Sequence, residues 1–375
     1  MKKEGRLFFY AVFGITGFLC TLINIRYLNA ALESDNRFNY IFVLVDIVCS
    51  LVVALYTQVI VHETGHLVFG YISGYGFSSF RIGSYVWIKK DGKIQLKRYR
   101  LSGTGGQCLM VPPKFKDDKV PFIRYNLGGI AFNVFFAVFV LFVKLILALF
   151  FKESVHFTVF LNVQFIVALS YAVTNGIPAS IGGINNDGYN ALIMRNNPKA
   201  INAFYTQLII SSMSYHGVRL KDMPEEYFVK PDKKEMKNSM IATLGVFYAG
   251  RLMDQHKIDE AVEYMEYLLN DDEVSIAGVN RELLINDMIY CELIEDNRKH
   301  VIESYMTKEH DKVISTMKND PAIIRTNYAY SLFYERDEEK AQKYKIEFEN
   351  VKDKYPYVGE IESQTELMIL AKDLY

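Results

Sequence analysis

The chain has 375 residues, of which 50% are hydrophobic and 14% aromatic, and its formal net charge at pH 7 is −1. A near-neutral charge argues against a general nucleic-acid binder, which normally presents a basic face. The four cysteines form no C-x-x-C pair, which argues against a disulfide framework and against cysteine-ligated zinc. Long uncharged apolar runs are confined to the first half. We therefore predict a transmembrane domain over residues 1–190 and a soluble domain over residues 191–375.

Four apolar runs predict transmembrane helices, at about residues 7–25, 40–61, 127–151 and 157–178. Each is long enough to cross a hydrocarbon core of about 30 Å at a rise of about 1.5 Å per residue. The first run could instead be a cleaved signal peptide. Its 19 uncharged residues exceed a usual signal core, and only a faint cleavage site follows, at residues 29–31. We therefore expect it to be retained as a span.

The segment between the second and third spans, about residues 74–113, predicts a small membrane-associated β-hairpin. Aromatic and β-branched residues at 85–88 and 94–96 flank a turn at Asp91-Gly92. The glycine-rich stretch at 102–106 is no phosphate loop, because no G-K-[ST] follows it. We interpret it as a flexible turn at the membrane surface, with a substrate-contacting loop as the alternative.

The distribution of basic residues predicts the orientation in the membrane. Lysines and arginines are concentrated between the second and third spans, and the other loops between spans carry few. Because basic loops stay on the cytoplasmic side, this segment, the N-terminus and everything after the fourth span are expected in the cytoplasm. These assignments are mutually consistent for four spans.

The second half of the chain predicts helical repeats. Stretches near Phe247, Ile289 and Tyr328 follow one another at about 40 residues, and each predicts a helix, a short polar turn and a second helix. Two of them resemble tetratricopeptide repeats, whose usual period is nearer about 34 residues. We predict a cytoplasmic tetratricopeptide-like region, with an irregular helical bundle as the alternative. Because such repeats form concave surfaces, a protein partner or a substrate tail is expected to bind there.

The strongest chemical signal is the H-E-x-x-H pattern at residues 62–66, at the end of the second span. Residues four apart share one helix face, so His62 and His66 can bind one metal ion. Glu63 lies on the neighbouring face, where it can take a proton from a water that zinc activates. Two ordinary histidines and a surface glutamate are the alternative. It is disfavoured because ionisable groups at the end of an apolar span are costly and usually functional.

A catalytic zinc site needs a third protein ligand and an open position. His156 is expected at the opposite membrane face, and Asp46 lies about 24 Å along the helix from His62. The remaining histidines fall in the soluble half. Asp187 is the better candidate, because it follows the fourth span and returns to the cytoplasmic side. Its local sequence is equally compatible with an ordinary turn aspartate.

Residues 40–190 resemble the site-2 protease family of intramembrane zinc metalloproteases. The resemblance rests on residues 62–66 as H-E-x-G-H, on residues 129–133 as G-P-x-x-N, and on Asn175 to Pro178 with Asn186 to Gly188 as N-x-x-P…D-G. Ile130 replaces the usual proline, and the stretch between Pro178 and Asp187 is longer and richer in glycine than the common form. The chain is thus expected in an outlying branch of the family. It has no room for a PDZ insertion, and the resemblance does not extend to the helical repeats.

This resemblance implies that His62, His66 and Asp187 bind Zn²⁺, that Glu63 is the catalytic base, and that Asn133 lies near the substrate backbone. It implies a zinc-dependent metalloendopeptidase in a bacterial cell membrane. Its substrates would be membrane-anchored proteins or peptides, cleaved near the cytoplasmic face, as in regulated intramembrane proteolysis. The alternative is a membrane-anchored helical-repeat scaffold with a non-catalytic zinc site, although such a scaffold has no need of Glu63.

Overall fold

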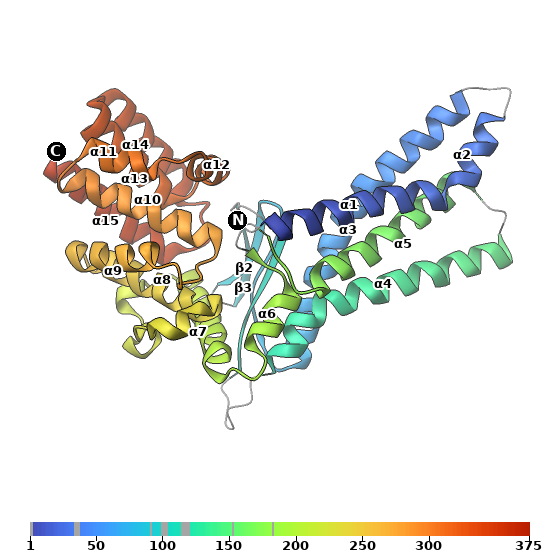
Figure 1. The fold of residues 1–375 in the computed structure, drawn as a ribbon, viewed down its shortest axis with the longest axis horizontal. Helices are drawn as coiled ribbons and strands as arrows, with labels where there is room; N and C mark the ends of the chain where they lie inside the picture. Colours follow the sequence, from blue (N-terminus) through green and yellow to red (C-terminus); the bar gives the residue numbers. More distant parts are fainter. Residues whose placement is uncertain are drawn as a thin grey trace. The chain divides into compact units, whose positions relative to one another are not determined.

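The computed structural model describes residues 3–33, 38–90, 92–98, 104–113, 121–151, 154–181 and 184–375. Within these ranges the protein is mainly helical, with helices α1 to α15 and a small antiparallel sheet, as the sequence predicts (Figure 1). The chain forms two compact units. The first comprises Met1–Gly74 and Pro121–Leu192, and the second comprises Tyr75–Val120 and Ile193–Tyr375.

The first unit is built mainly from long apolar helices. Its elements are α1 (Lys3–Ile23), α2 (Ile25–Leu32), α3 (Phe38–Ile72), α4 (Phe122–Phe150), α5 (Val155–Gly176), the two-residue strands β5 (Ser180–Ile181) and β6 (Ile184–Asn185), and the start of α6 (Asp187–Met194). Helices α3, α4 and α5 are long and apolar enough to cross a membrane. Helices α1 and α2 would supply a fourth span if they count as one, but they are bent by 54°.

Helix α3 extends beyond the predicted apolar limit of the second span, about residue 61, and includes both motif histidines, as their helical spacing predicts. Helix α3 continues to Ile72 and stops before Gly74, which has a left-handed φ of 85°. The predicted limit followed the first ionisable side chains. Such side chains do not interrupt a helix, whereas a glycine in the left-handed conformation commonly ends one. Both motif histidines therefore lie inside a continuous helix, which fixes their relative register.

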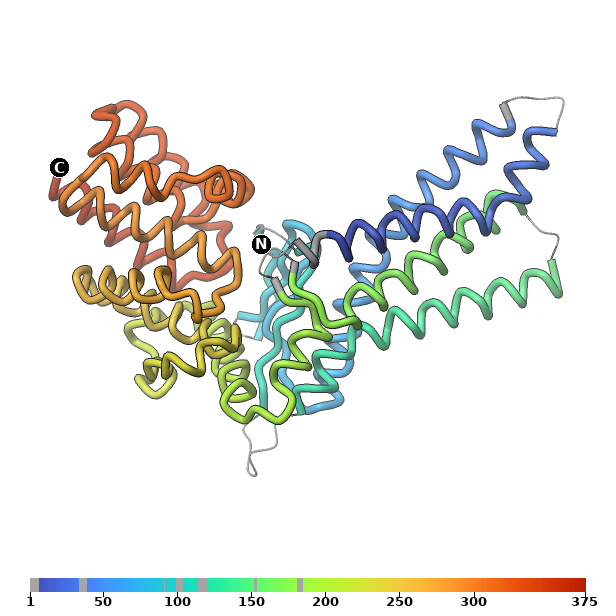
Figure 2. The backbone as a smooth tube through the Cα atoms, viewed as in Figure 1, coloured from blue at the N-terminus to red at the C-terminus, as the bar shows by residue number. Residues whose placement is uncertain are grey.

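Helix α1 is packed into the bundle of the first unit, in which α3, α4 and α5 lie side by side (Figure 2). Cys20 of α1 shares a buried cluster with Ala54 of α3 and Val167 of α5. At the bend after α1, the Asn24 Oδ1 atom accepts a hydrogen bond of 2.8 Å from Asn162 Nδ2 of α5. Hydrogen bonds between membrane helices contribute about 0.6–2 kcal/mol each. The retention of the first run as a span stays a prediction.

The sheet of the second unit is larger than the predicted hairpin. Its strands are β1 (Gly76–Ile82), β2 (Tyr85–Lys90), β3 (Lys93–Arg98) and β4 (Gly106–Val111), in the order β3-β2-β1-β4. The hairpin is confirmed as β2 and β3, although its turn residue Asp91 lies outside the described residues. Strand β1, except its first residue, falls within residues 77–95, which the sequence assigned to the hairpin without separating this strand. Its Arg81 is buried, with the guanidinium donating to the carbonyl oxygens of Gly83 and Gly106. Of the predicted glycine-rich loop, residues 102 and 103 also lie outside the described residues.

The sheet packs against the C-terminal helices, whereas the sequence placed it with the spans. Tyr215 of α7 (Pro198–Tyr215) shares a buried cluster with Val86 and Ile88 of β2. At the end of β3, the backbone N–H of Arg98 donates to the carbonyl oxygen of Lys354 at 3.1 Å. The sheet and the C-terminal helices are therefore one compact unit.

The remaining helices of the second unit form successive pairs. They are α8 (Ser239–Asp254), α9 (Ile258–Asn270), α10 (Gly278–Ile294), α11 (Lys299–Tyr305), α12 (Lys308–Thr316), α13 (Pro321–Tyr330), α14 (Glu338–Lys352) and α15 (Val358–Leu374), with short helical turns at Leu220–Asp222, Glu225–Phe228, Lys233–Lys237 and Ser331–Glu335. The three predicted stretches coincide with the pairs α8–α9, α10–α11 and α13–α14. Their classification as tetratricopeptide repeats stays a prediction.

Two carboxyl groups of the second unit have raised pKa values. Burial raises the pKa of Asp320 to about 6. Burial, with a further contribution from the Asp320 charge, raises the pKa of Glu360 to about 8. The Tyr355 hydroxyl donates to Glu360 Oε2 at 2.8 Å and lies 3.4 Å from Asp320 Oδ2. Between the ordinary carboxyl pKa, about 4, and these raised values, the folded state therefore binds more protons than the unfolded chain.

We expect the stability of the second unit to fall as the pH rises from about 5 to about 8. The slope for one fully titrating group is about 1.4 kcal/mol per pH unit. Trp87 is the single tryptophan and lies in β2, so its fluorescence reports thermal unfolding of this unit in detergent. Glu360→Gln, which mimics the protonated carboxyl, should flatten the dependence. Glu362→Gln, at an exposed position of the same helix, should leave the pH dependence unchanged. Equal slopes in the two variants would refute the assignment of the pH dependence to Glu360.

Candidate metal centre

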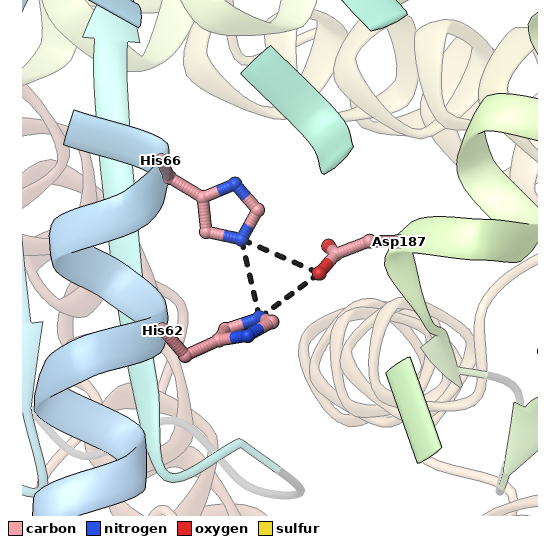
Figure 3. Close-up of side chains that lie close together, drawn as sticks. All are labelled: His62, His66 and Asp187. Atoms are coloured by element: carbon pink, nitrogen blue, oxygen red, sulfur yellow. Dashed lines mark hydrogen bonds and ion pairs between the residues drawn. The ribbon is translucent and has the colours of Figure 1, made fainter. Parts of the chain in front are cut away.

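The three predicted metal ligands converge in the first unit (Figure 3). His62 and His66 project from consecutive turns of α3, with their Nε2 atoms 3.2 Å apart. Asp187 is the first residue of α6, and its Oδ2 atom lies 2.9 Å from His62 Nε2 and 3.3 Å from His66 Nε2. Within the described ranges, these residues are the group of histidine, cysteine and acidic side chains that could hold a metal ion.

The other nitrogen of each imidazole faces an acceptor. His66 Nδ1 lies 2.8 Å from the carbonyl oxygen of Tyr125, which can only accept a hydrogen bond. The proton of a neutral His66 ring is therefore on Nδ1, and Nε2 presents a lone pair. His62 Nδ1 lies 2.7 Å from Asn133 Oδ1, an arrangement that gives the same tautomer. This is the usual orientation of a metal-binding histidine.

The donor atoms fit a zinc ion. Two imidazole lone pairs and one carboxylate oxygen lie 2.9–3.3 Å from one another, and Asp187 Oδ2 is buried with no hydrogen-bond partner. Tetrahedral bonds of about 2.0–2.1 Å to zinc place ligand atoms about 3.3 Å apart. Burial raises the pKa of the Asp187 carboxyl, but the electrostatic attraction of the carboxylate to His66 and His62 lowers it by more, to below its ordinary value. A metal ion held there would supply positive charge and keep the carboxylate ionised.

Glycines allow the two helices that surround the site to touch. A Cβ atom added to Gly65 of α3 would lie 2.3 Å from the carbonyl oxygen of Gly128 in α4. A Cβ atom added to Gly129 would lie 2.6 Å from His62 Cε1 and 2.7 Å from His66 Nε2. The imidazoles therefore pack directly on the Cα of Gly129. The sequence placed Gly129 in a motif but did not reveal this steric role.

Asn186 fixes the start of α6 and therefore the position of Asp187. Its Oδ1 atom accepts from the backbone N–H of Tyr189 at 2.9 Å, as an N-cap residue does. Its Nδ2 atom donates to the carbonyl oxygens of Thr174 and Ile177, at the end of α5. From the sequence, Asn186 was part of the resemblance to the family and of a possible turn, without this capping role.

Glu63 lies in the wall of the site, where its side chain is buried and interacts electrostatically with His66 and Tyr171. The two candidates rejected as ligands lie elsewhere: His156 forms an ion pair with Asp46, between α5 and α3. Glu63 is thus the acidic side chain adjacent to the ligand cluster in the sequence and in space.

Comparison with known families gives one match. The model of peptidase family M50 matches residues 50–324 and so includes the whole ligand cluster. The match runs beyond residues 40–190, to which the sequence resemblance was limited, and reaches α13 in the helical region. No curated protein and no solved structure matches the chain.

Proposed function

Because the chain belongs to peptidase family M50, whose members are zinc-dependent intramembrane metalloproteases, we propose that it hydrolyses membrane-anchored proteins or peptides with Glu63 as general base. The observation that carries this proposal is the convergence of three acceptor atoms, from His62, His66 and Asp187, beside a buried glutamate. Structural zinc sites are closed by four protein ligands, whereas catalytic sites have three and one open position.

The residues of the site have separate tasks in this reaction. A zinc ion held by the three ligands would polarise the scissile carbonyl and activate a water molecule. Glu63 follows His62 directly on α3, so the helix fixes its Cα relative to both histidines, and its side chain is buried as theirs are. We propose that Glu63 accepts the proton of the attacking water and donates it to the leaving amine.

The proposal also covers the substrate and the orientation of the protein in the membrane. A membrane-spanning substrate must unwind, because carbonyl groups in a helix are already hydrogen-bonded. Its freed backbone would add as a strand to a sheet edge, and the edges of the observed sheet are β3 and β4. We propose cleavage near the cytoplasmic face of a bacterial membrane, in regulated intramembrane proteolysis. The helical region would recruit a substrate tail or partner.

Glu63→Gln is expected to abolish cleavage but to retain zinc. Glutamine keeps the shape of the side chain but cannot take a proton, and loss of a general base lowers the rate about 10²–10⁴-fold. The test uses purified protein in detergent, elemental analysis for zinc, and mass spectrometry of single-span test proteins. Thr64→Ala is the control, since the Thr64 hydroxyl donates to the backbone of its own helix at Ile60. Undiminished cleavage by Glu63→Gln would rule out Glu63 as base.

A further inference from the structure

A chain of three polar side chains is buried where α3 meets α4. Gln58 and Asn133 are fully buried (0% exposed), and His62 is 7% exposed. Gln58 precedes His62 by one helical turn, so the two side chains share a face of α3. Polar groups within membrane helices are costly, face the bundle interior and mark functional positions.

The contacts of Asn133 determine which way its amide points. Asn133 Nδ2 lies 2.9 Å from Gln58 Oε1 and 3.3 Å from the backbone carbonyl oxygen of Gln58. A backbone carbonyl can only accept, so the NH₂ group of Asn133 must face Gln58. The opposite end of the amide, Oδ1, then faces His62 Nδ1 at 2.7 Å.

This orientation selects the tautomer of His62. The Oδ1 atom accepts a hydrogen bond, so the neutral imidazole carries its proton on Nδ1 and presents a lone pair at Nε2. A reversed amide would place a donor against Nδ1 and move the proton to Nε2, where it would block metal binding. For His66 the corresponding acceptor is the backbone carbonyl of Tyr125, which no substitution of a side chain removes.

We propose that Asn133 is a positioning residue that holds His62 in its metal-binding tautomer, and that Gln58 sets the orientation of Asn133. This inference rests on the proposed zinc-dependent function and assigns Asn133 a role other than the predicted contact with the substrate backbone, which stays a prediction. Gln58 supplies a second observation: its Nε2 atom is buried with no hydrogen-bond partner. If the Gln58 amide were turned, this donor would face Asn133 Nδ2, which is also a donor. Gln58 must therefore present Oε1 to Asn133, and this orientation leaves its Nε2 atom unpaired.

The test is the zinc affinity of the full-length protein in detergent, measured by competition with a chromophoric chelator. Asn133→Leu is expected to weaken zinc binding about 10–100-fold, the usual effect of removing a partner of a metal-binding histidine. Asn133→Asp should bind zinc more tightly than Asn133→Leu, because one carboxylate oxygen also accepts from Nδ1 and the Gln58 amide can turn to donate to the other oxygen. Gln58→Glu should bind like the wild type. Gln58→Leu should show a smaller loss than Asn133→Leu, since the backbone acceptor remains.

Gln164→Leu is the matched control. Gln164 is also a buried amide in a spanning helix, at 2% exposed, and its side chain has no hydrogen-bond partner. Its replacement should leave zinc affinity unchanged. Undiminished zinc binding by Asn133→Leu, or equal losses in Asn133→Leu and Asn133→Asp, would overturn the inference. If Asn133→Leu does not fold, Asn133→Ala takes its place with the same outcomes. A wild-type protein without zinc would instead refute the proposed function.

Discussion

Replacing Asp187 with alanine is expected to remove the zinc ion and to reduce cleavage to background. Asp187 supplies the charged ligand of the three, and its Oδ2 atom lies 2.9 Å and 3.3 Å from the two imidazole nitrogens. Without it two histidines of one helix remain, and two ligands do not form a catalytic zinc site. Elemental analysis should give one zinc ion per wild-type chain and none in Asp187→Ala or His66→Ala.

The matched control is His156→Ala. His156 pairs with Asp46 and lies outside the ligand cluster, so this variant should retain its zinc. Unlike Glu63→Gln, which keeps the metal, the ligand variants should lose metal and activity together. Zinc retained by Asp187→Ala would contradict the three-ligand site. Zinc absent from the wild type would refute the zinc-dependent function.

The part of the site that the sequence could predict is the part set by local geometry. Spacing on one helix was sufficient to place His62, Glu63 and His66 together, and α3 is continuous through all of them. Asp187 could not be chosen from its neighbours, because a turn aspartate has the same local sequence. Its selection depended on resemblance to a family, and the structure places it within 3.3 Å of both histidines.

The supporting residues were not predictable because their roles arise from packing between helices. Gln58 and Asn133 are 75 positions apart and meet only where α3 crosses α4. The fold shows the same limit. Long apolar runs predicted α3, α4 and α5, but not the 54° bend after α1. In the sheet, β1 contains the buried Arg81, whose guanidinium donates to the carbonyl oxygen of Gly106, 25 residues later on the neighbouring strand β4.

Gly129→Ala is expected to disrupt zinc binding although it adds only one methyl group. That methyl carbon would lie 2.6 Å from His62 Cε1 and 2.7 Å from His66 Nε2, closer than non-bonded atoms allow. The helices cannot separate at this level without breaking the backbone contact between Gly65 and Gly128. The imidazoles must therefore rotate or α4 must shift, and either movement alters the ligand distances. Overpacking of this kind costs about 1–3 kcal/mol, so the melting temperature should fall as well.

Gly14→Ala separates this crowding from the general effect of alanine. Gly14 lies within α1, and a Cβ atom there would meet nothing within 4 Å. Alanine in a helix is otherwise favoured over glycine by about 0.5–1 kcal/mol, so Gly14→Ala should be neutral or stabilising and should bind zinc normally. Thermal stability and zinc affinity are measured for both variants in the same detergent. Both quantities should fall in Gly129→Ala. In Gly14→Ala the zinc affinity should be unchanged and the thermal stability unchanged or higher. Wild-type zinc affinity in Gly129→Ala would show that the site can absorb a methyl group, and that the bare Cα of Gly129 does not determine the position of the imidazoles.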